Sequence, residues 1–173
     1  MQWWVSPGVC GATCIQAAID YASNGDTVKV KSGVFNEQVN INKSITVTQG
    51  SLPIIDGGGS GDVVTISADG VTLDGFEIRN GTNGVVLALG ADSATVKNNN
   101  IHTFTSAGIR ANGGTGEDIN TNIVTGPHTG SCAGGFWGII VVDTSGSIAT
   151  NTVPGIGNGL ASGCQEGRAI QAE

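Results

Sequence analysis

Val96-Lys97-Asn98-Asn99-Asn100-Ile101 is one copy of a six-residue pattern that occurs four times in this chain, with apolar residues at its first and last places and Asn at the fourth place in three copies and Phe in one. The other copies begin at Leu73, Ile119 and Ile148. Successive copies start 23, 23 and 29 residues apart. A period in this range is typical of a solenoid, in which each repeat forms one turn and stacks on its neighbours.

A second pattern keeps step with the first. It consists of a glycine followed by short apolar runs, and its copies begin at Gly84, Gly108, Gly138 and Gly167. The segments between the runs are rich in Gly, Asn, Ser and Thr, which excludes the helical returns of a leucine-rich repeat. Two or three short strands with polar corners in each turn predict an all-β fold. We expect a right-handed parallel β-helix of about six turns.

Three asparagines, Asn99, Asn122 and Asn151, occupy the same place in successive copies of the first pattern. A buried amide costs free energy unless it is hydrogen-bonded, and stacking lets the N–H of one side chain reach the oxygen of the next. Phe76 takes this place one turn earlier. The asparagines are therefore interpreted as a structural ladder and not as catalytic groups.

One amphipathic helix is predicted ahead of the repeats, at about residues 14–23. Thr13 and Gln16 have the spacing of a capping box at its start, and Asn24-Gly25 supplies a left-handed residue at its end. Such a helix would cover the first turn, which has no neighbour on that side. Residues 1–173 are expected to form a single domain.

The composition excludes two classes of partner. The formal net charge is −7 and no cluster of Lys or Arg occurs, so a nucleic-acid partner is not expected. No apolar stretch is long enough to cross a bilayer, so no membrane partner is expected. The four cysteines are Cys10, Cys14, Cys132 and Cys164. Two disulfides, Cys10 with Cys14 and Cys132 with Cys164, are favoured over free thiols, which indicates a secreted or periplasmic protein.

Residues 13–50 resemble the opening of the pectin lyase-like β-helix superfamily. The resemblance is carried by TCIQAAID at 13–20, GDTVKV at 25–30, GVFNE at 33–37 and VNINKSITV at 39–47. That superfamily includes pectate lyases, pectin methylesterases, polygalacturonases and uncharacterised secreted proteins. The resemblance implies the β-helix fold and favours extracellular carbohydrate as the ligand, but it does not select an activity.

The repeats offer no clear catalytic set. A pectate-type lyase needs carboxylates that gather calcium beside a basic residue. Two outward columns of the repeat gather no carboxylates; they hold Asp74, Lys97, Asn120 and Ala149, and Arg79, His102, Thr125 and Pro154. The pair Glu117-Asp118 is weak evidence for calcium, which stays open, and no other cofactor is identified. His102 and His128 are interpreted as isolated turn residues, so no metal site is predicted.

The second pattern gives the candidate ligand-binding residues. If Val85, Ile109 and Ile139 point inward, then Val86 and Ile140 point outward. An apolar outer side implies a cover, which could be the long turn 126–137 or a second subunit. If nothing covers it, aromatic rings beside polar groups would suit a sugar. The candidate residues for that sugar site are Arg110, Asn112, Phe136, Trp137 and Asp143.

The leading hypothesis from the sequence is a secreted β-helix module that binds polysaccharide or glycan. The first alternative is a lyase or esterase that acts on acidic polysaccharide. The second is a structural protein that forms a homodimer through its apolar strand side or through its C-terminal end. The chain stops at Glu173 in or just after a strand, and such an end exposes unpaired backbone to another chain.

Overall fold

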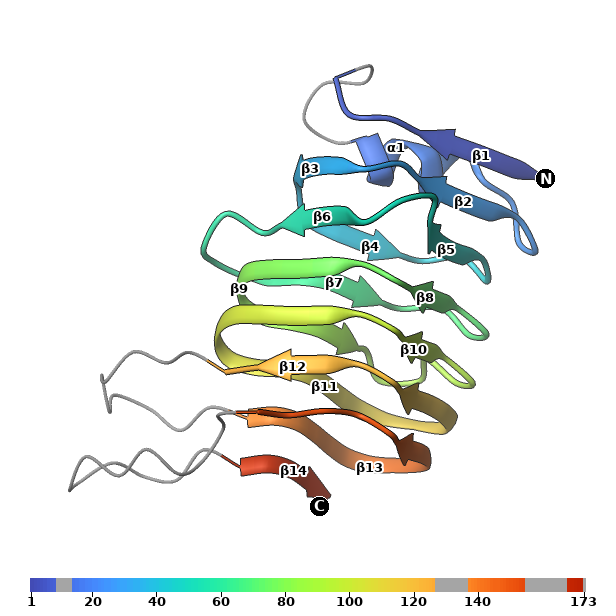
Figure 1. Cartoon of the computed structure of the whole chain (residues 1–173). Coiled ribbons are helices and arrows are strands. Elements are labelled where there is room, and N and C mark those ends of the chain that lie inside the picture. The colour runs from blue at the N-terminus through green and yellow to red at the C-terminus, as the bar shows by residue number, and fades with distance from the viewer. Residues whose placement is uncertain (9–13, 127–136, 155–167, 173) are drawn as a thin grey trace.

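The computed structural model describes residues 1–8, 14–126 and 137–154, and the backbone of residues 168–172. It is an all-β parallel solenoid of about five turns with one short helix at its N-terminal end (Figure 1). The predicted fold is therefore confirmed, with a slightly smaller number of turns. All of the strand pairs are parallel.

The solenoid has three sides, which we name sheet A, sheet B and sheet C. Sheet A contains β1 (Gln2–Val5), β2 (Thr27–Val30), β5 (Thr46–Gln49), β8 (Thr72–Asp74), β10 (Thr95–Lys97) and the ends of β11 and β13. Sheet B contains β3 (Gly33–Asn36), β6 (Pro53–Asp56), the beginnings of β9 and β11, and β12 (Ile123–Thr125). Sheet C contains β4 (Val39–Ile41), β7 (Asp62–Ile66), the end of β9, the middle of β11, the beginning of β13, and β14 (Arg168–Ala172).

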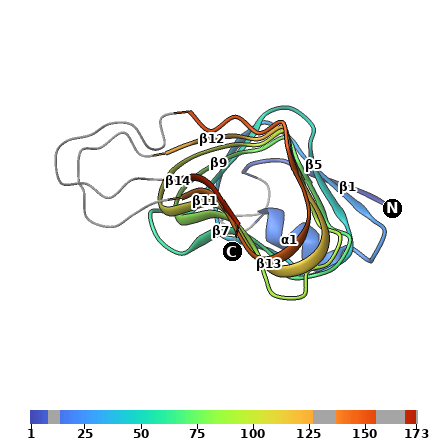
Figure 2. The same cartoon turned by 90° about the horizontal axis from the view of Figure 1, so that it is seen from below.

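Three long strands run round the corners and join the sides. They are β9 (Glu77–Leu87), β11 (Asn100–Asn120) and β13 (Trp137–Ala149). Figure 2 looks along the solenoid and shows successive turns lying over one another. Strands of one sheet are about 4.8 Å apart, so a side chain meets the equivalent side chain of the next turn.

Apolar side chains fill the interior in columns. Leu73, Val96 and Ile119 form part of the sheet A column, and each is fully buried. Val85, Ile109 and Ile139 form part of the sheet C column and are also fully buried. On sheet A these positions alternate with the polar residues Asp74, Lys97 and Asn120, which sets the register, because a one-residue slip would turn the apolar set outward.

The predicted asparagine ladder is present. Asn99 Nδ2 donates to Asn122 Oδ1 at 3.0 Å, and Asn122 Nδ2 donates to Asn151 Oδ1 at 3.0 Å. The same oxygens accept backbone N–H groups, including that of Asn99. Phe76 ends the ladder, and its own N–H donates to Asn99 Oδ1. These bonds explain how amides are tolerated inside an apolar column.

The residue before each ladder position has a left-handed backbone. This residue is Gly75, Asn98, Thr121 or Thr150 in successive turns, with φ of 89°, 55°, 52° and 55°. Gly and Asn adopt this conformation readily, whereas a β-branched threonine does so at a cost. The two threonines therefore mark strained corners.

Helix α1 (Cys14–Tyr21) covers the interior at the N-terminal end, as Figure 2 shows. Its Ile15 and Ile19 are fully buried against the core, as expected of a capping helix. The helix ends two residues before the predicted boundary, and Gly25 has the expected positive φ of 84°. No helix in the described segments is long and apolar enough to cross a bilayer.

Glu37 caps the start of α1, a role that the sequence did not reveal. Its two carboxylate oxygens accept the N–H groups of Ile15 and Gln16 at 2.9 and 3.0 Å. Thr13, the predicted cap, lies outside the described residues. The Gln16 side chain exchanges hydrogen bonds with the backbone of Asn40. Its part in the predicted capping box with Thr13 stays a prediction.

Cys14 is disulfide-bonded. Cys10, Cys132 and Cys164 lie outside the described residues, so both favoured pairings stay predictions. His128 also lies outside them.

Candidate functional site

Arg110 lies on the outer side of sheet C, between Val86 on β9 and Ile140 on β13. Alternation along β11 places it there, because Ile109 and Ala111 on either side are buried in the core. Its Nε donates to Asn112 Oδ1 at 2.7 Å. Among the described residues Arg110 has no carboxylate partner, so the four N–H groups on its terminal nitrogens remain available to an anion.

Val86 and Ile140 are only 7% and 6% exposed, although they point outward. The flanks of Arg110 are thus largely shielded from solvent within a single chain. Shielding of this kind strengthens an ion pair that Arg110 makes with a ligand, because the local dielectric constant is lower. The predicted cover, the turn 126–137, lies almost entirely outside the described residues and stays a prediction.

The other candidate residues of this region are spread along the strand. Asn112 is hydrogen-bonded to Arg110 and is in register with Val142 of β13. Asp143 is the residue after Val142. Asp143 is exposed, has a φ of 48° and makes no ion pair with Arg110. The half-buried Trp137 pairs with Ala107, three positions before Arg110. Phe136 lies outside the described residues.

A second group of charged side chains lies on the outer side of sheet B. Arg79 is central: its Nε donates to Asp56 Oδ2 at 2.9 Å and its Nη1 donates to Glu77 Oε1 at 3.1 Å. His102 joins the group, with Nε2 at 3.3 Å from Glu77 Oε1. Its Nδ1 lies 2.8 Å from the Thr103 hydroxyl oxygen. We call Asp56, Glu77, Arg79 and His102 the sheet B cluster.

The sheet B cluster shifts the ionisation of two of its members. Burial, the largest influence on Asp56, raises its pKa, but hydrogen bonds from the Gly58 N–H, Arg79 and Asn80 outweigh it and hold the pKa below its ordinary value. The hydrogen bond to Asp56 raises the pKa of Arg79 further. Asp56 and Arg79 therefore form a firmly ionised pair, in which each satisfies the other.

The sheet B cluster corrects two interpretations of the sequence. The column that holds Arg79 and His102 does gather a carboxylate, because Asp56 precedes Arg79 in it. His102 is neither isolated nor in a turn, since it lies in β11 beside Glu77. The sequence spacing could have placed Asp56 in this column, because Asp56 and Arg79 are separated by 23 residues, the same period as the later repeats.

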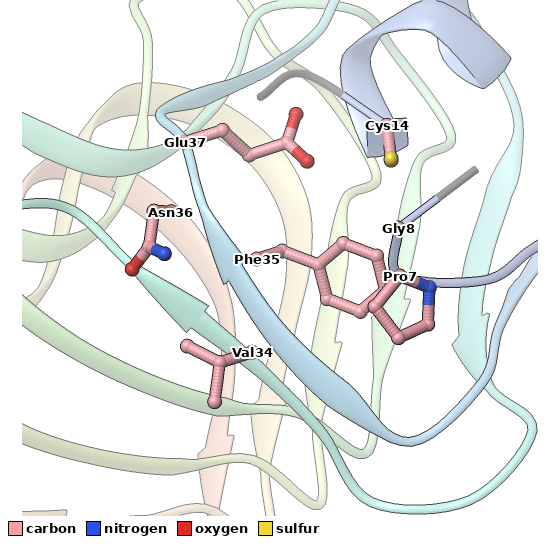
Figure 3. A pocket seen from close by; sticks show the side chains of 7 residues that line it. All are labelled: Pro7, Gly8, Cys14, Val34, Phe35, Asn36 and Glu37. Carbon is pink, nitrogen blue, oxygen red and sulfur yellow. The ribbon is translucent and has the colours of Figure 1, made fainter. Parts of the chain in front are cut away.

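A small cavity of about 140 Å³ lies beside the start of α1 (Figure 3). It is lined by Pro7, Gly8, Cys14, Val34, Phe35, Asn36 and Glu37. Glu37 is the only acidic residue among the described lining residues, and its oxygens already accept the helix N–H groups. Burial raises the pKa of Glu37, against the opposing effect of those hydrogen bonds. The cavity therefore looks like part of the cap and not like a ligand site.

Glu117 and Asp118, the pair considered for calcium, point to opposite sides of β11. Glu117 is 2% exposed inside the corner, and among the described residues neither of its carboxylate oxygens has a hydrogen-bond partner. Asp118 is half-buried on the outer side. The two carboxylates thus do not face one ion. Within the described part of the chain, no three His, Cys, Asp or Glu side chains are grouped to hold a metal.

Comparison of the sequence with protein-family models and with curated proteins gives no match. The structure is similar to the crystal structure of an alginate lyase from Paenibacillus sp. str. FPU-7, with a TM-score of 0.61 and 18% sequence identity. The alignment covers 84% of this chain and 57% of the lyase, so this chain spans little more than half of that protein. At this identity the similarity shows a shared β-solenoid fold.

Proposed function

We propose that this chain binds acidic polysaccharide through the outer side of sheet C. The observation that carries the proposal is Arg110, an arginine without a carboxylate partner in the described part of an otherwise acidic chain. A guanidinium group binds a carboxylate through two parallel hydrogen bonds, which suits the uronate groups of such polymers.

The surroundings of Arg110 support the same ligand. Asn112 accepts the hydrogen bond from Nε, which leaves the two terminal nitrogens of Arg110 to pair with a carboxylate. Val86 and Ile140 lower the dielectric constant around it. The shared fold with an enzyme named as an alginate lyase is further support, because alginate is a polymer of uronic acids.

Two wider proposals accompany this function. The segments at 13–20, 25–30, 33–37 and 39–47 favour membership of the pectin lyase-like superfamily, and the fold of the structural neighbour is compatible with it. The four cysteines favour a secreted or periplasmic location, where disulfides persist and polysaccharide is encountered. Non-reducing peptide mapping would test the pairs Cys10 with Cys14 and Cys132 with Cys164.

Native gel electrophoresis in gels that contain alginate tests the binding. We expect alginate and polygalacturonate to retard the wild-type protein and a neutral polysaccharide not to do so. Arg110→Ala should weaken the retardation about ten-fold or more, because a charged hydrogen-bonded contact is lost. Lys97→Ala is the matched control, since Lys97 already lies 3.9 Å from Asp74 on sheet A. Equal retardation of Arg110→Ala and the wild type would refute this site.

A lyase or esterase is a second candidate function, and the sheet B cluster is the observation that favours it. Glu77 would fix the tautomer of His102, which could then act as a base. Arg79 is less suited to bind substrate, because Asp56 and Glu77 already occupy it. An assay for unsaturated product and for released ester groups, with His102→Ala as the inactive control, separates an enzyme from a binding module.

A homodimer stays an alternative from the sequence. The molecular mass in solution over a range of concentrations tests it directly. A mass near twice that of the monomer would favour it.

A further inference from the structure

Trp4 lies on the outer side of sheet A, near the N-terminal end. It stands in β1, in register with Lys29 of β2, and its side chain crosses β2 toward the end of β5. There it passes over Gly50: a Cβ added to Gly50 would lie 3.0 Å from the ring atom Cζ3 of Trp4. The absence of a side chain at Gly50 thus leaves room for the indole.

Trp4 is more than half exposed, at 56% for the whole residue. An indole usually buries most of its surface in the folded protein. An exposed indole that packs over the backbone therefore indicates a binding surface. Indole faces pack well against the apolar face of a sugar ring. Exposed aromatic rings with polar neighbours are therefore typical of carbohydrate contacts.

Two ammonium groups approach the same ring. Lys29 Nζ lies 5.5 Å and Lys31 Nζ lies 5.8 Å from its centroid, within the range of a cation–π contact. Neither lysine pairs with a carboxylate in the described part of the chain. Two like charges without a counter-ion repel each other, and an anion bound beside them would relieve that repulsion.

Rows of hydroxyl groups continue along sheet A from this point. Thr27, Thr46, Thr72 and Thr95 are in register on its outer side, one strand spacing apart. None of their hydroxyl groups is bonded within the described residues. A regular row of free hydroxyls suits a polymer that carries many hydroxyls of its own, and it distinguishes a carbohydrate from other polyanions.

We propose that Trp4, Lys29 and Lys31 form a second glycan-binding site, which takes a uronate unit of an acidic polysaccharide. The indole contacts the sugar ring, the two ammonium groups bind the carboxylate, and Gly50 leaves the space in which the indole lies. The polymer runs along the threonine row of sheet A. This site lies on a different side of the solenoid from Arg110, which is on sheet C, and Figure 2 shows β1 and β5 apart from β7. It does not depend on Arg110.

Calorimetric titration with short oligogalacturonates tests this inference. The double variant Lys29→Gln and Lys31→Gln should weaken binding about ten-fold in the background of Arg110→Ala, where only this site remains. Trp4→Ala should weaken it several-fold and Trp4→Phe should restore most of it. Gly50→Ala should act in the same direction as Trp4→Ala, because it displaces the ring without removing a functional group.

Lys97→Gln on the same sheet is the control for charge, and circular dichroism checks that each variant is folded. Unchanged affinity of the Lys29 and Lys31 double variant would overturn the inference. The inference would also be overturned if polyphosphate bound as tightly as the oligogalacturonates and Trp4→Ala did not change that binding. Such a result would indicate that the site attracts any polyanion. Loss of binding in Arg110→Ala alone, with no residual binding, would support the sheet C site and refute this one.

Discussion

Asn99 donates its side-chain N–H to Oδ1 of Asn122 at 3.0 Å, inside the solenoid and 23 residues away in sequence. The bond joins two successive turns at equivalent positions. The oxygen of Asn122 also accepts the backbone N–H of Asn99, and its own Nδ2 donates to the carbonyl of Val96 and to Asn151. One side chain thus satisfies polar groups of three turns.

The ladder predicts a large effect of one substitution. Asn122→Ala should lower the free energy of unfolding by about 2–4 kcal/mol, because it leaves buried donors and acceptors of both neighbouring turns without partners. Asn36→Ala, at an exposed position on sheet B, should change it by less than about 0.5 kcal/mol. Urea denaturation followed by circular dichroism measures both. Equal effects would mean that the ladder does not stabilise the fold.

The strained corner at Thr121 predicts a stabilising substitution. Its φ of 52° is unfavourable for a β-branched residue, and the equivalent corner one turn earlier has Asn98. Thr121→Asn should therefore raise the free energy of unfolding by about 0.5–1 kcal/mol. Thr125→Asn, in strand β12, should not stabilise the protein. A lower melting temperature of Thr121→Asn would contradict the interpretation.

The burial of Glu117 predicts that removal of its carboxylate stabilises the fold. Both of its oxygens lack partners among the described residues, and burial of an unpaired carboxylate costs free energy. Glu117→Met keeps the length of the side chain and should raise the free energy of unfolding by about 1–3 kcal/mol. Asp118→Asn, on the outer side of the same strand, is the control. If Glu117→Met unfolds more easily, the carboxylate holds a partner such as an ion or water.

The Asp56 and Arg79 pair predicts a dependence on pH. The folded-state pKa of Asp56 lies below its ordinary value of 3.8, so the pair contributes its full stability above that value. The contribution is lost as the pH falls through the lower, folded-state pKa. Wild type should therefore be more stable than Asp56→Asn at pH 7, and the difference should shrink at acidic pH. A difference that stays constant down to about pH 2 would contradict the assigned shift.

The fold could be predicted from the sequence because stacking makes equivalent residues visible as a period. Asn99, Asn122 and Asn151 are far apart in the chain, but their spacing equals one turn, and the structure joins them. The Glu37 cap could not be found in this way. It joins a corner of the solenoid to a helix that lies outside the repeat, and no spacing records such a contact.

The candidate sites were only partly visible. Arg110 could be placed on the outer side of its strand by alternation, and its contact with Asn112 follows from the same rule. Asp56 belongs to the Arg79 column by spacing, but it precedes the clear repeats. Trp4 reaches Gly50 diagonally across a strand, so neither period nor alternation indicates the contact.

The central claim is that Arg110 binds the carboxylate of an acidic polysaccharide. Isothermal titration calorimetry with alginate oligosaccharides, comparing wild type, Arg110→Lys and Arg110→Ala, tests it most directly. Affinity should fall in that order, because lysine keeps the charge but loses the two parallel hydrogen bonds. If the wild-type protein binds no uronate oligosaccharide, or if all three proteins bind equally, the claim is wrong.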